Sequence, residues 1–88
     1  MEKIIKGVKY NTGTAKLLTG VETATLTSEF LYQKTNGMYF LLRRTVDGEV
    51  IVPFPWGSIG LNHDHAKKWA EENLTVRAYE KIFGEVSE

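Results

Sequence analysis

The arrangement of hydrophobic and polar positions along the chain changes after about residue 56. Before that point, runs of aromatic and β-branched side chains are separated by short turn signals, which is typical of strands. After it, Ala66, Trp69, Ala70 and Leu74 recur at helical spacing, and Thr75 is the predicted N-cap of a second short helix. We therefore predict an α+β fold, with an antiparallel β-meander of four to five strands followed by two short C-terminal helices packed on one face. The predicted β-sheet part is 1–56 and the predicted helical part is 61–84, within a single domain.

Two turn signals define the meander. Asn36-Gly37 and Asp47-Gly48 each stand between strand-like runs, and both dipeptides favour two-residue hairpin turns. The resulting strands span roughly 27–35, 38–46 and 49–56. Upstream, Lys3–Tyr10 and Ala15–Thr25 are weaker strand candidates. The Pro53-Phe54-Pro55 segment predicts the end of pairing or an edge strand, because proline has no N–H to donate.

As two-residue type I′ turns, they predict a register that pairs Lys34 with Tyr39 and Arg43 with Val52. This register divides the side chains of the meander between two faces. The first face collects Phe30, Tyr32, Tyr39, Leu41, Val50, Val52, Phe54 and Trp56. The second collects Leu31, Phe40, Leu42 and Ile51, with Glu29 opposite Arg44. The second face is too apolar for a solvated sheet surface, so we expect either that the N-terminal strands cover it or that it binds a partner. Under the latter alternative, the partner-binding residues are Leu31, Phe40, Leu42, Arg44 and Ile51.

Composition places the chain among ordinary globular domains. Its 88 residues fit one core, and 42% hydrophobic and 25% charged residues argue against disorder. The absence of cysteine excludes disulfides and fits a reducing cytoplasm. No apolar stretch is long enough for a signal peptide or a membrane span. We expect a cytoplasmic protein that does not associate with membranes.

The charge balance bears on nucleic-acid binding. The chain has 11 basic and 11 acidic residues; residues 1–56 contain seven Lys and Arg against five Asp and Glu, and residues 57–88 contain four against six. Arg43 and Arg44, beside aromatic side chains, are candidates for contacts with single-stranded nucleic acid. The alternative is that Arg44 pairs with Glu29 while Arg43 lies near the Phe30 ring. Neutral charge favours this second interpretation.

The only two histidines, His63 and His65, flank Asp64. Residues two apart on a helix lie about 200° apart around its axis, whereas a helical metal pair needs a spacing of three or four. The segment is better explained as the start of a helix, with Asn62 as N-cap and Asp64 near the positive end of the helix dipole. The sequence shows no paired carboxylates, phosphate loop or nucleophile motif. We therefore predict no enzymatic activity, no cofactor and no metal site.

Three groups of residues carry a resemblance. The N-terminal group is Lys3-Ile4-Ile5, Gly7, Tyr10, Thr12, Thr14 and Ala15. The middle group is Leu31-Tyr32, Gly37 and Tyr39-Phe40-Leu41. The C-terminal group is Ala66, Trp69-Ala70-Glu71, Leu74, Tyr79 and Phe83-Gly84. In order and spacing, over nearly the whole chain, they resemble a family of small, mostly uncharacterised proteins of Gram-positive bacteria and their phages and mobile elements.

The resemblance implies a setting and not a reaction. Small proteins of such elements often bind a host or phage macromolecule, and some inhibit CRISPR and other defence systems. Members of the family often have a longer polar insert where Asp47-Gly48 closes a tight hairpin here. We expect a non-enzymatic protein-interaction module, whose simplest form is self-association into a dimer. Single-stranded nucleic-acid binding is the alternative.

Overall fold

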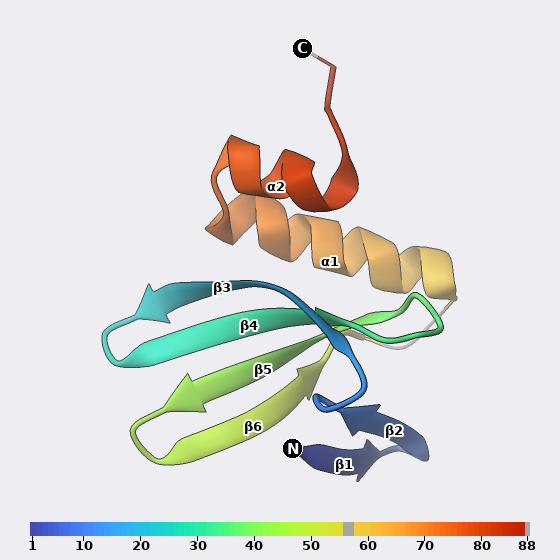
Figure 1. The fold of residues 1–88 in the computed structure, drawn as a ribbon, viewed down its shortest axis with the longest axis vertical. Coiled ribbons are helices and arrows are strands. Elements are labelled where there is room, and N and C mark those ends of the chain that lie inside the picture. The colour runs from blue at the N-terminus through green and yellow to red at the C-terminus, as the bar shows by residue number, and fades with distance from the viewer. Residues whose placement is uncertain (56–57, 88) are drawn as a thin grey trace.

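The computed structural model describes residues 1–55 and 58–87, so the predicted position of Trp56 lies outside the described residues. The described strands are β1 (Glu2–Ile5), β2 (Val8–Asn11), β3 (Lys16–Ala24), β4 (Thr27–Gln33), β5 (Tyr39–Thr45) and β6 (Gly48–Pro53). Two helices follow, α1 (Ile59–Asn73) and α2 (Val76–Phe83), as Figure 1 shows. The predicted α+β fold is confirmed.

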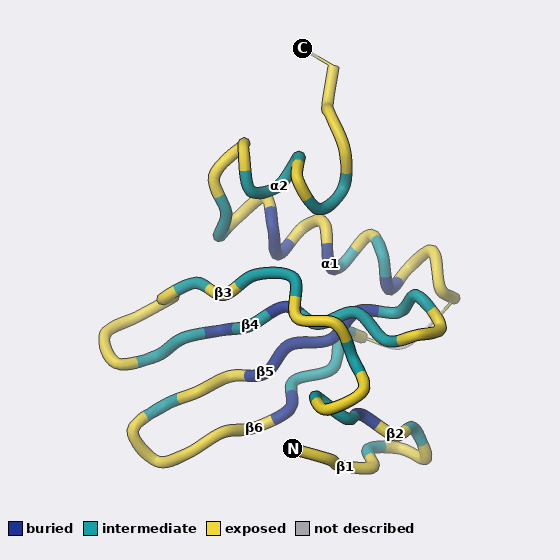
Figure 2. Tube along the Cα trace, viewed as in Figure 1, coloured by how far each residue is buried: buried dark blue, intermediate teal, exposed yellow. Residues whose placement is uncertain are grey.

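The sheet lies between two different covers. Strands β3, β4, β5 and β6 form one antiparallel sheet in sequence order, and β1 and β2 form a separate hairpin. The helices lie on one side of the sheet and the β1–β2 hairpin on the other (Figure 1). Figure 2 shows that the buried residues are concentrated in β4, β5 and the sheet-facing side of α1. Strand β6 ends at Pro53 on a sheet edge, as the prolines predict.

The N-terminal segment differs from the prediction of one strand over Lys3–Tyr10. It folds back at Lys6-Gly7, where both residues have positive φ angles of 50° and 78°. Two consecutive positive φ angles suit the tight turn of a two-residue hairpin. Tyr10 of this hairpin is buried together with Phe40 of the sheet. The apolar second face is therefore covered by N-terminal strands, which is the first of the two predicted alternatives.

The connection between β4 and β5 is one residue longer than predicted. Lys34 N–H donates to the Met38 carbonyl at 2.7 Å, and Gly37 N–H donates to the Lys34 carbonyl at 2.9 Å. The loop thus contains three residues and ends at Gly37, whose φ of +93° suits glycine. As a result Leu31 pairs with Leu41, and the predicted pairing of Lys34 with Tyr39 is wrong.

This change moves the side chains of β4 to the opposite faces, because successive strand residues alternate. Leu31 lies on the helix side in the core cluster with Tyr39 and Leu41. Phe30 and Tyr32 lie on the hairpin side with Phe40, Leu42 and Ile51. The predicted faces of β4 are therefore wrong.

The connection between β5 and β6 also differs from the prediction. The loop residues are Val46 and Asp47, and Thr45 pairs with Gly48. Asp47 is not among the residues with positive φ, so it does not form the predicted type I′ turn with Gly48. Compared with the predicted register, the pairing of β5 with β6 is shifted by two residues. Because side chains alternate along a strand, a shift by an even number keeps Tyr39, Leu41, Val50 and Val52 on one face, as predicted.

The helix boundaries are set by two caps. Helix α1 begins at Ile59 and its N-cap is Ser58, whose Oγ accepts from Leu61 N–H at 3.2 Å, so the predicted Asn62 cap is wrong. Helix α2 begins after Thr75, whose Oγ1 accepts from Ala78 N–H at 3.1 Å, and this predicted cap is confirmed. Gly84 follows α2 with a φ of +93°.

Substitution of Gly20 by alanine tests the close packing of β3 on β4. A Cβ at Gly20 would lie 2.6 Å from Cδ1 of Phe30, so the Phe30 ring has to move out of its packed position. We expect the Gly20→Ala variant to lose about 1–3 kcal/mol of unfolding free energy in urea titrations. The matched control is Gly60→Ala, where a Cβ meets nothing closer than Ser58 Oγ at 3.7 Å. In helix α1 this change is expected to stabilise by about 0.5–1 kcal/mol. Equal effects at both positions would contradict the packing argument.

Candidate functional site

The residues predicted to bind a partner lie mainly inside the fold. Leu31 and Phe40 are 0% exposed, and Leu42 and Ile51 are also buried. Leu31 contacts the helix side of the core, whereas the other three pack under the N-terminal hairpin. The sheet therefore does not present these four apolar side chains to a partner, and only Arg44 of the predicted set is exposed.

The two arginines have exchanged the roles predicted for them. Arg43 donates from Nε and from its terminal nitrogen to Oε2 of Glu29, at 3.0 and 2.8 Å. Arg44 pairs with Glu49 and lies over the Phe30 ring, with 4.8 Å between Cζ and the ring centroid. The predicted pairing of Arg44 with Glu29 is therefore wrong, and so is the predicted place of Arg43 near Phe30. The physical reason is the β4–β5 register, which puts Glu29 opposite Arg43.

Glu29 connects the sheet to helix α1. Its carboxylate is buried, and Oε1 accepts from the indole Nε1–H of Trp69 at 2.9 Å. Oε2 is held by Arg43, so both carboxylate oxygens have charged or polar donors. Such partners offset the cost of removing a carboxylate from water. The hydrogen bond from Trp69 to the buried Glu29 carboxylate holds this part of α1 against the sheet.

Asn62 connects the other end of α1 to the sheet. Its Oδ1 accepts from the Tyr39 N–H at 2.7 Å, and its Nδ2 donates to the Tyr39 carbonyl at 3.0 Å. The amide therefore pairs with the first residue of β5 as another strand would. Asn62 is buried, and this role explains why it is not the helix cap.

The histidines lie in the second turn of α1. Nε2 of His63 is 3.0 Å from the Gly37 carbonyl, and its ring meets Tyr39 edge-on at 5.1 Å between centroids. Asp64 is outside the first turn of α1, so the predicted interaction with the helix dipole is absent there. Within residues 1–55 and 58–87, no three His, Cys, Asp or Glu side chains are placed to hold a metal. His63 connects the helix to the β4–β5 loop.

No helix in the described part of the chain has the length and apolarity needed to cross a membrane.

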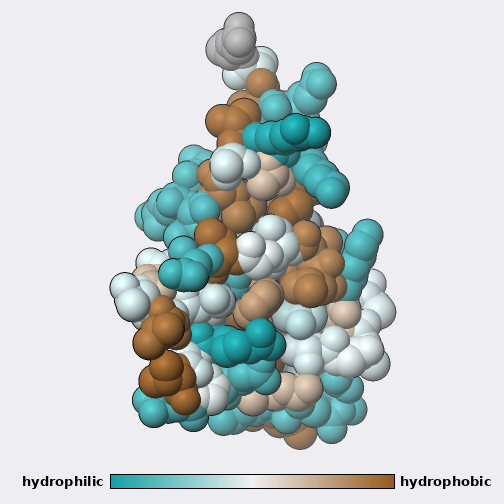
Figure 3. All heavy atoms as spheres, turned by 60° about the vertical axis from the view of Figure 1, so that its left-hand side comes forward, coloured by the Kyte–Doolittle hydropathy of each residue, from teal (hydrophilic) through white to brown (hydrophobic). Residues whose placement is uncertain are grey.

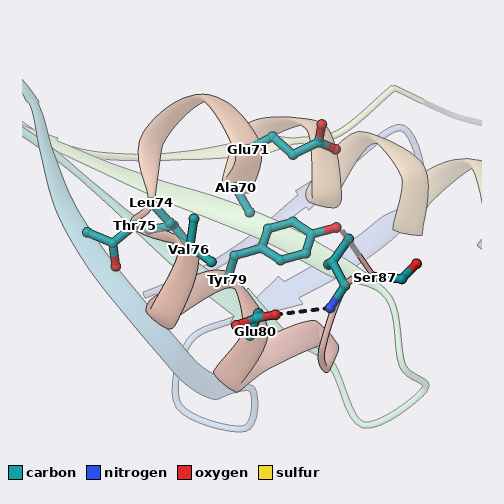
Figure 4. Close-up of a pocket in the computed structure, with 9 residues that line it drawn as sticks. Ala70, Glu71, Leu74, Thr75, Val76, Tyr79, Glu80 and Ser87 are labelled. Carbon is teal, nitrogen blue, oxygen red and sulfur yellow. Dashed lines mark hydrogen bonds between the residues drawn. The ribbon is translucent and has the colours of Figure 1, made fainter.

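A hollow lies in the helical part of the molecule. We call it the helical groove; it has a volume of about 450 Å³ and is lined by Ala70, Glu71, Leu74, Thr75, Val76, Tyr79, Glu80, Val86 and Ser87. In Figure 4 the Tyr79 ring lies between Ala70 and Ser87, with Glu71 and Glu80 on either side. Figure 3 shows hydrophobic side chains gathered over the helical half of the molecule with hydrophilic ones around them.

The helical groove is built from three segments. The end of α1, the start of α2 and the segment after α2 each contribute lining residues. The last segment is held by the Val86 N–H, which donates to Oε2 of Glu80 at 3.0 Å. Val76 and Val86 are 76% and 60% exposed beside this hollow. These exposed apolar side chains make the groove the strongest candidate binding site.

The amino-acid sequence alone does not reveal the helical groove. Val76 is three residues before Tyr79 and seven before Phe83, so helical spacing places it on the apolar side of α2. Its exposure is a property of the tertiary structure. Val86 follows Gly84, beyond the end of α2, and only the tertiary structure places it beside Tyr79.

Comparison of the chain with protein-family models, with curated proteins and with solved structures finds no match.

Substitution of Asn62 by alanine tests the connection between α1 and β5. The variant leaves the N–H and the carbonyl of buried Tyr39 without their partners, so we expect unfolding free energy to fall by about 2–3 kcal/mol. Asn73→Ala is the control, because its side chain donates only to a carbonyl within the same helix. Urea titrations measure both. A loss at Asn62 no larger than at Asn73 would contradict the proposed connection.

The buried tyrosines predict a dependence of stability on alkaline pH. Burial raises the pKa of Tyr10 and of Tyr39 above the ordinary value of 10.0. Each raised pKa means that the folded state keeps its phenol proton after the unfolded state has lost it. The stabilising contribution is therefore complete below pH 10.0 and is lost as pH rises above it, toward the folded-state pKa. We expect the loss to be smaller in Tyr10→Phe and Tyr39→Phe than in the parent chain. Melting temperatures across this range measure it, and equal losses in the parent chain and in both variants would contradict the burial argument.

Proposed function

We propose that this chain is a non-enzymatic protein-interaction module that binds a segment of another protein in the helical groove. The observation that supports this most directly is the exposure of Val76 and Val86 beside a hollow lined by Leu74 and Tyr79. Covering these apolar side chains would remove their surface from water, at roughly 25 cal/mol per Å². The central part of each sheet face is already covered, by the helices or by the N-terminal hairpin.

Charge specifies the partner further. Glu71 and Glu80 line the groove, and residues 57–88 contain six Asp and Glu against four Lys and Arg. A complementary segment therefore carries apolar side chains on one side and lysine or arginine beside them. An amphipathic helix of this composition suits a groove of this kind.

The resemblance to small proteins of phages and mobile elements supports a biological setting for this module. In that setting it would bind and modulate a host macromolecular complex, as inhibitors of defence systems do. The absence of cysteine is consistent with action in a reducing cytoplasm.

Self-association and nucleic-acid binding have less support. Light scattering addresses the first, and a dimer that disappears in Val76→Lys would identify the occupant of the groove as a second copy. For the second, Phe30 and Tyr32 pack in the cluster under the N-terminal hairpin, and Arg44 is already paired with Glu49. An aromatic platform for bases is therefore not open on this sheet.

Binding of a synthetic amphipathic helix with leucines on one face and lysines beside them tests the proposal. Fluorescence anisotropy of the labelled peptide should show roughly tenfold tighter binding than for the same peptide with glutamate in place of lysine. Val76→Lys should weaken binding of the lysine peptide by roughly tenfold or more, because it places a cation in the apolar groove.

Leu26→Lys is the matched control for this substitution. Leu26 is 70% exposed in the turn between β3 and β4 and does not line the helical groove. Both variants change an exposed apolar residue, so neither should unfold the protein. Equal affinity of the two variants, or equal binding of the lysine and glutamate peptides, would overturn the proposed groove.

A further inference from the structure

A second hollow has lysines in its lining, in contrast to the glutamates of the helical groove. It has a volume of about 290 Å³ and is lined by Lys9, Asn11, Thr14, Ala15, Lys34 and Thr35. These residues come from β2, from the turn before β3 and from the connection between β4 and β5. Five of the six side chains can donate hydrogen bonds, and within the described chain no carboxylate lines this hollow. We propose that it is a binding site for a phosphate monoester.

Lys34 is held in place at this site. Its Nζ lies 4.9 Å from the centroid of the Tyr10 ring, within the range of a cation–π interaction. Tyr10 is itself buried and meets Phe40 edge-on, with 5.3 Å between ring centroids. The ring contact uses the face of the ammonium toward Tyr10 and leaves its other N–H groups for a ligand. Less side-chain entropy is lost on binding when the cation is already positioned.

Lys9 and Asn11 already converge on an anionic oxygen. Oε2 of Glu2 lies 3.2 Å from Lys9 Nζ and accepts from Asn11 Nδ2 at 2.9 Å. A lysine ammonium has three N–H groups and an asparagine amide has two, so each has donors beyond the one that Glu2 takes. The Glu2 carboxylate shows that these donors can act together on one anion. It also reduces the positive charge and therefore competes with an external ligand.

The chemistry of the lining favours a dianion. The two ammonium groups of Lys9 and Lys34 match the charge of a phosphate monoester, which carries about −1.5 to −2 near neutral pH. The hydroxyl of Thr35 supplies a further donor for its three terminal oxygens, whereas the Thr14 hydroxyl already donates to the Asn11 carbonyl at 3.3 Å.

Titration with inorganic phosphate, followed by amide chemical shifts in ¹⁵N NMR spectra at constant ionic strength, tests the site. We expect saturable shifts at residues 9, 11, 14, 34 and 35. Lys34→Met keeps the aliphatic stem and removes the charge, and it should weaken binding by about fivefold or more. Lys9→Met should act in the same direction. Glu2→Gln should tighten binding severalfold, because it removes the competing carboxylate.

Lys67→Met is the matched control, because Lys67 is exposed on α1 and should leave phosphate affinity unchanged. Opposite effects of the Lys34 and Glu2 substitutions cannot arise from general loss of folding. The proposal is overturned if phosphate causes no saturable shifts in either the parent chain or Glu2→Gln. It is also overturned if Lys67→Met weakens binding as much as Lys34→Met does.

Three further ligands distinguish the source of the phosphate. Adenosine monophosphate that binds more tightly than inorganic phosphate, with adenosine inactive, supports a small phosphorylated metabolite. Equal affinity of the two supports recognition of the phosphate group alone. A thymidine oligonucleotide without terminal phosphate contains only diesters, and binding of this ligand alone would overturn the monoester site. None of these outcomes depends on the helical groove, so failure here leaves the proposed protein-binding function unaffected.

Discussion

The connection between β4 and β5 determines which side chains of the sheet face the helices. Gly37 adopts a φ of +93°, and the three-residue loop that ends there sets the pairing of the two strands. Leu31 consequently lies under the helices, and Glu29 lies opposite Arg43 and within hydrogen-bonding distance of Trp69. Side chains alternate along a strand, so a shift of one residue would send both to the hairpin side. The core on each face depends on this turn.

Two polar contacts then hold α1 on the face that the turn has selected. Asn62 binds the backbone of Tyr39, and Trp69 binds the carboxylate opposite Arg43. Asn62 and Trp69 are about 10 Å apart along the helix axis. Tyr39 and Arg43, the β5 residues at the two contacts, are about 14 Å apart along the strand. These similar lengths let the helix lie along the sheet and satisfy both contacts. Apolar packing alone is not directional, whereas these contacts specify where the helix sits.

The two candidate sites are formed by different parts of the chain. The helical groove involves α2 and the segment that follows it, and it has carboxylates in its lining. The phosphate site involves β2 and the turn before β3, and it has ammonium groups in its lining. The two sites therefore have opposite charge, although the chain as a whole is neutral. A chain with a net charge of zero can therefore have local patches of opposite charge that bind different ligands.

The amino-acid sequence by itself determined the kind of each element from β3 onward, the Thr75 cap of α2 and the end of β6 at Pro53. It also determined which β5 and β6 residues share a face. These properties depend on neighbouring residues, whose backbone preferences act locally. The tertiary structure decided the faces of β4, the role of Asn62 and the meeting of Val76 with Val86 beside Tyr79. Asn62 and its partner are 23 residues apart, and Trp69 and Glu29 are 40 apart, so no local preference specifies those contacts. They are selected when both faces of the sheet are covered at once, because only one register then satisfies the apolar packing and the buried polar groups together.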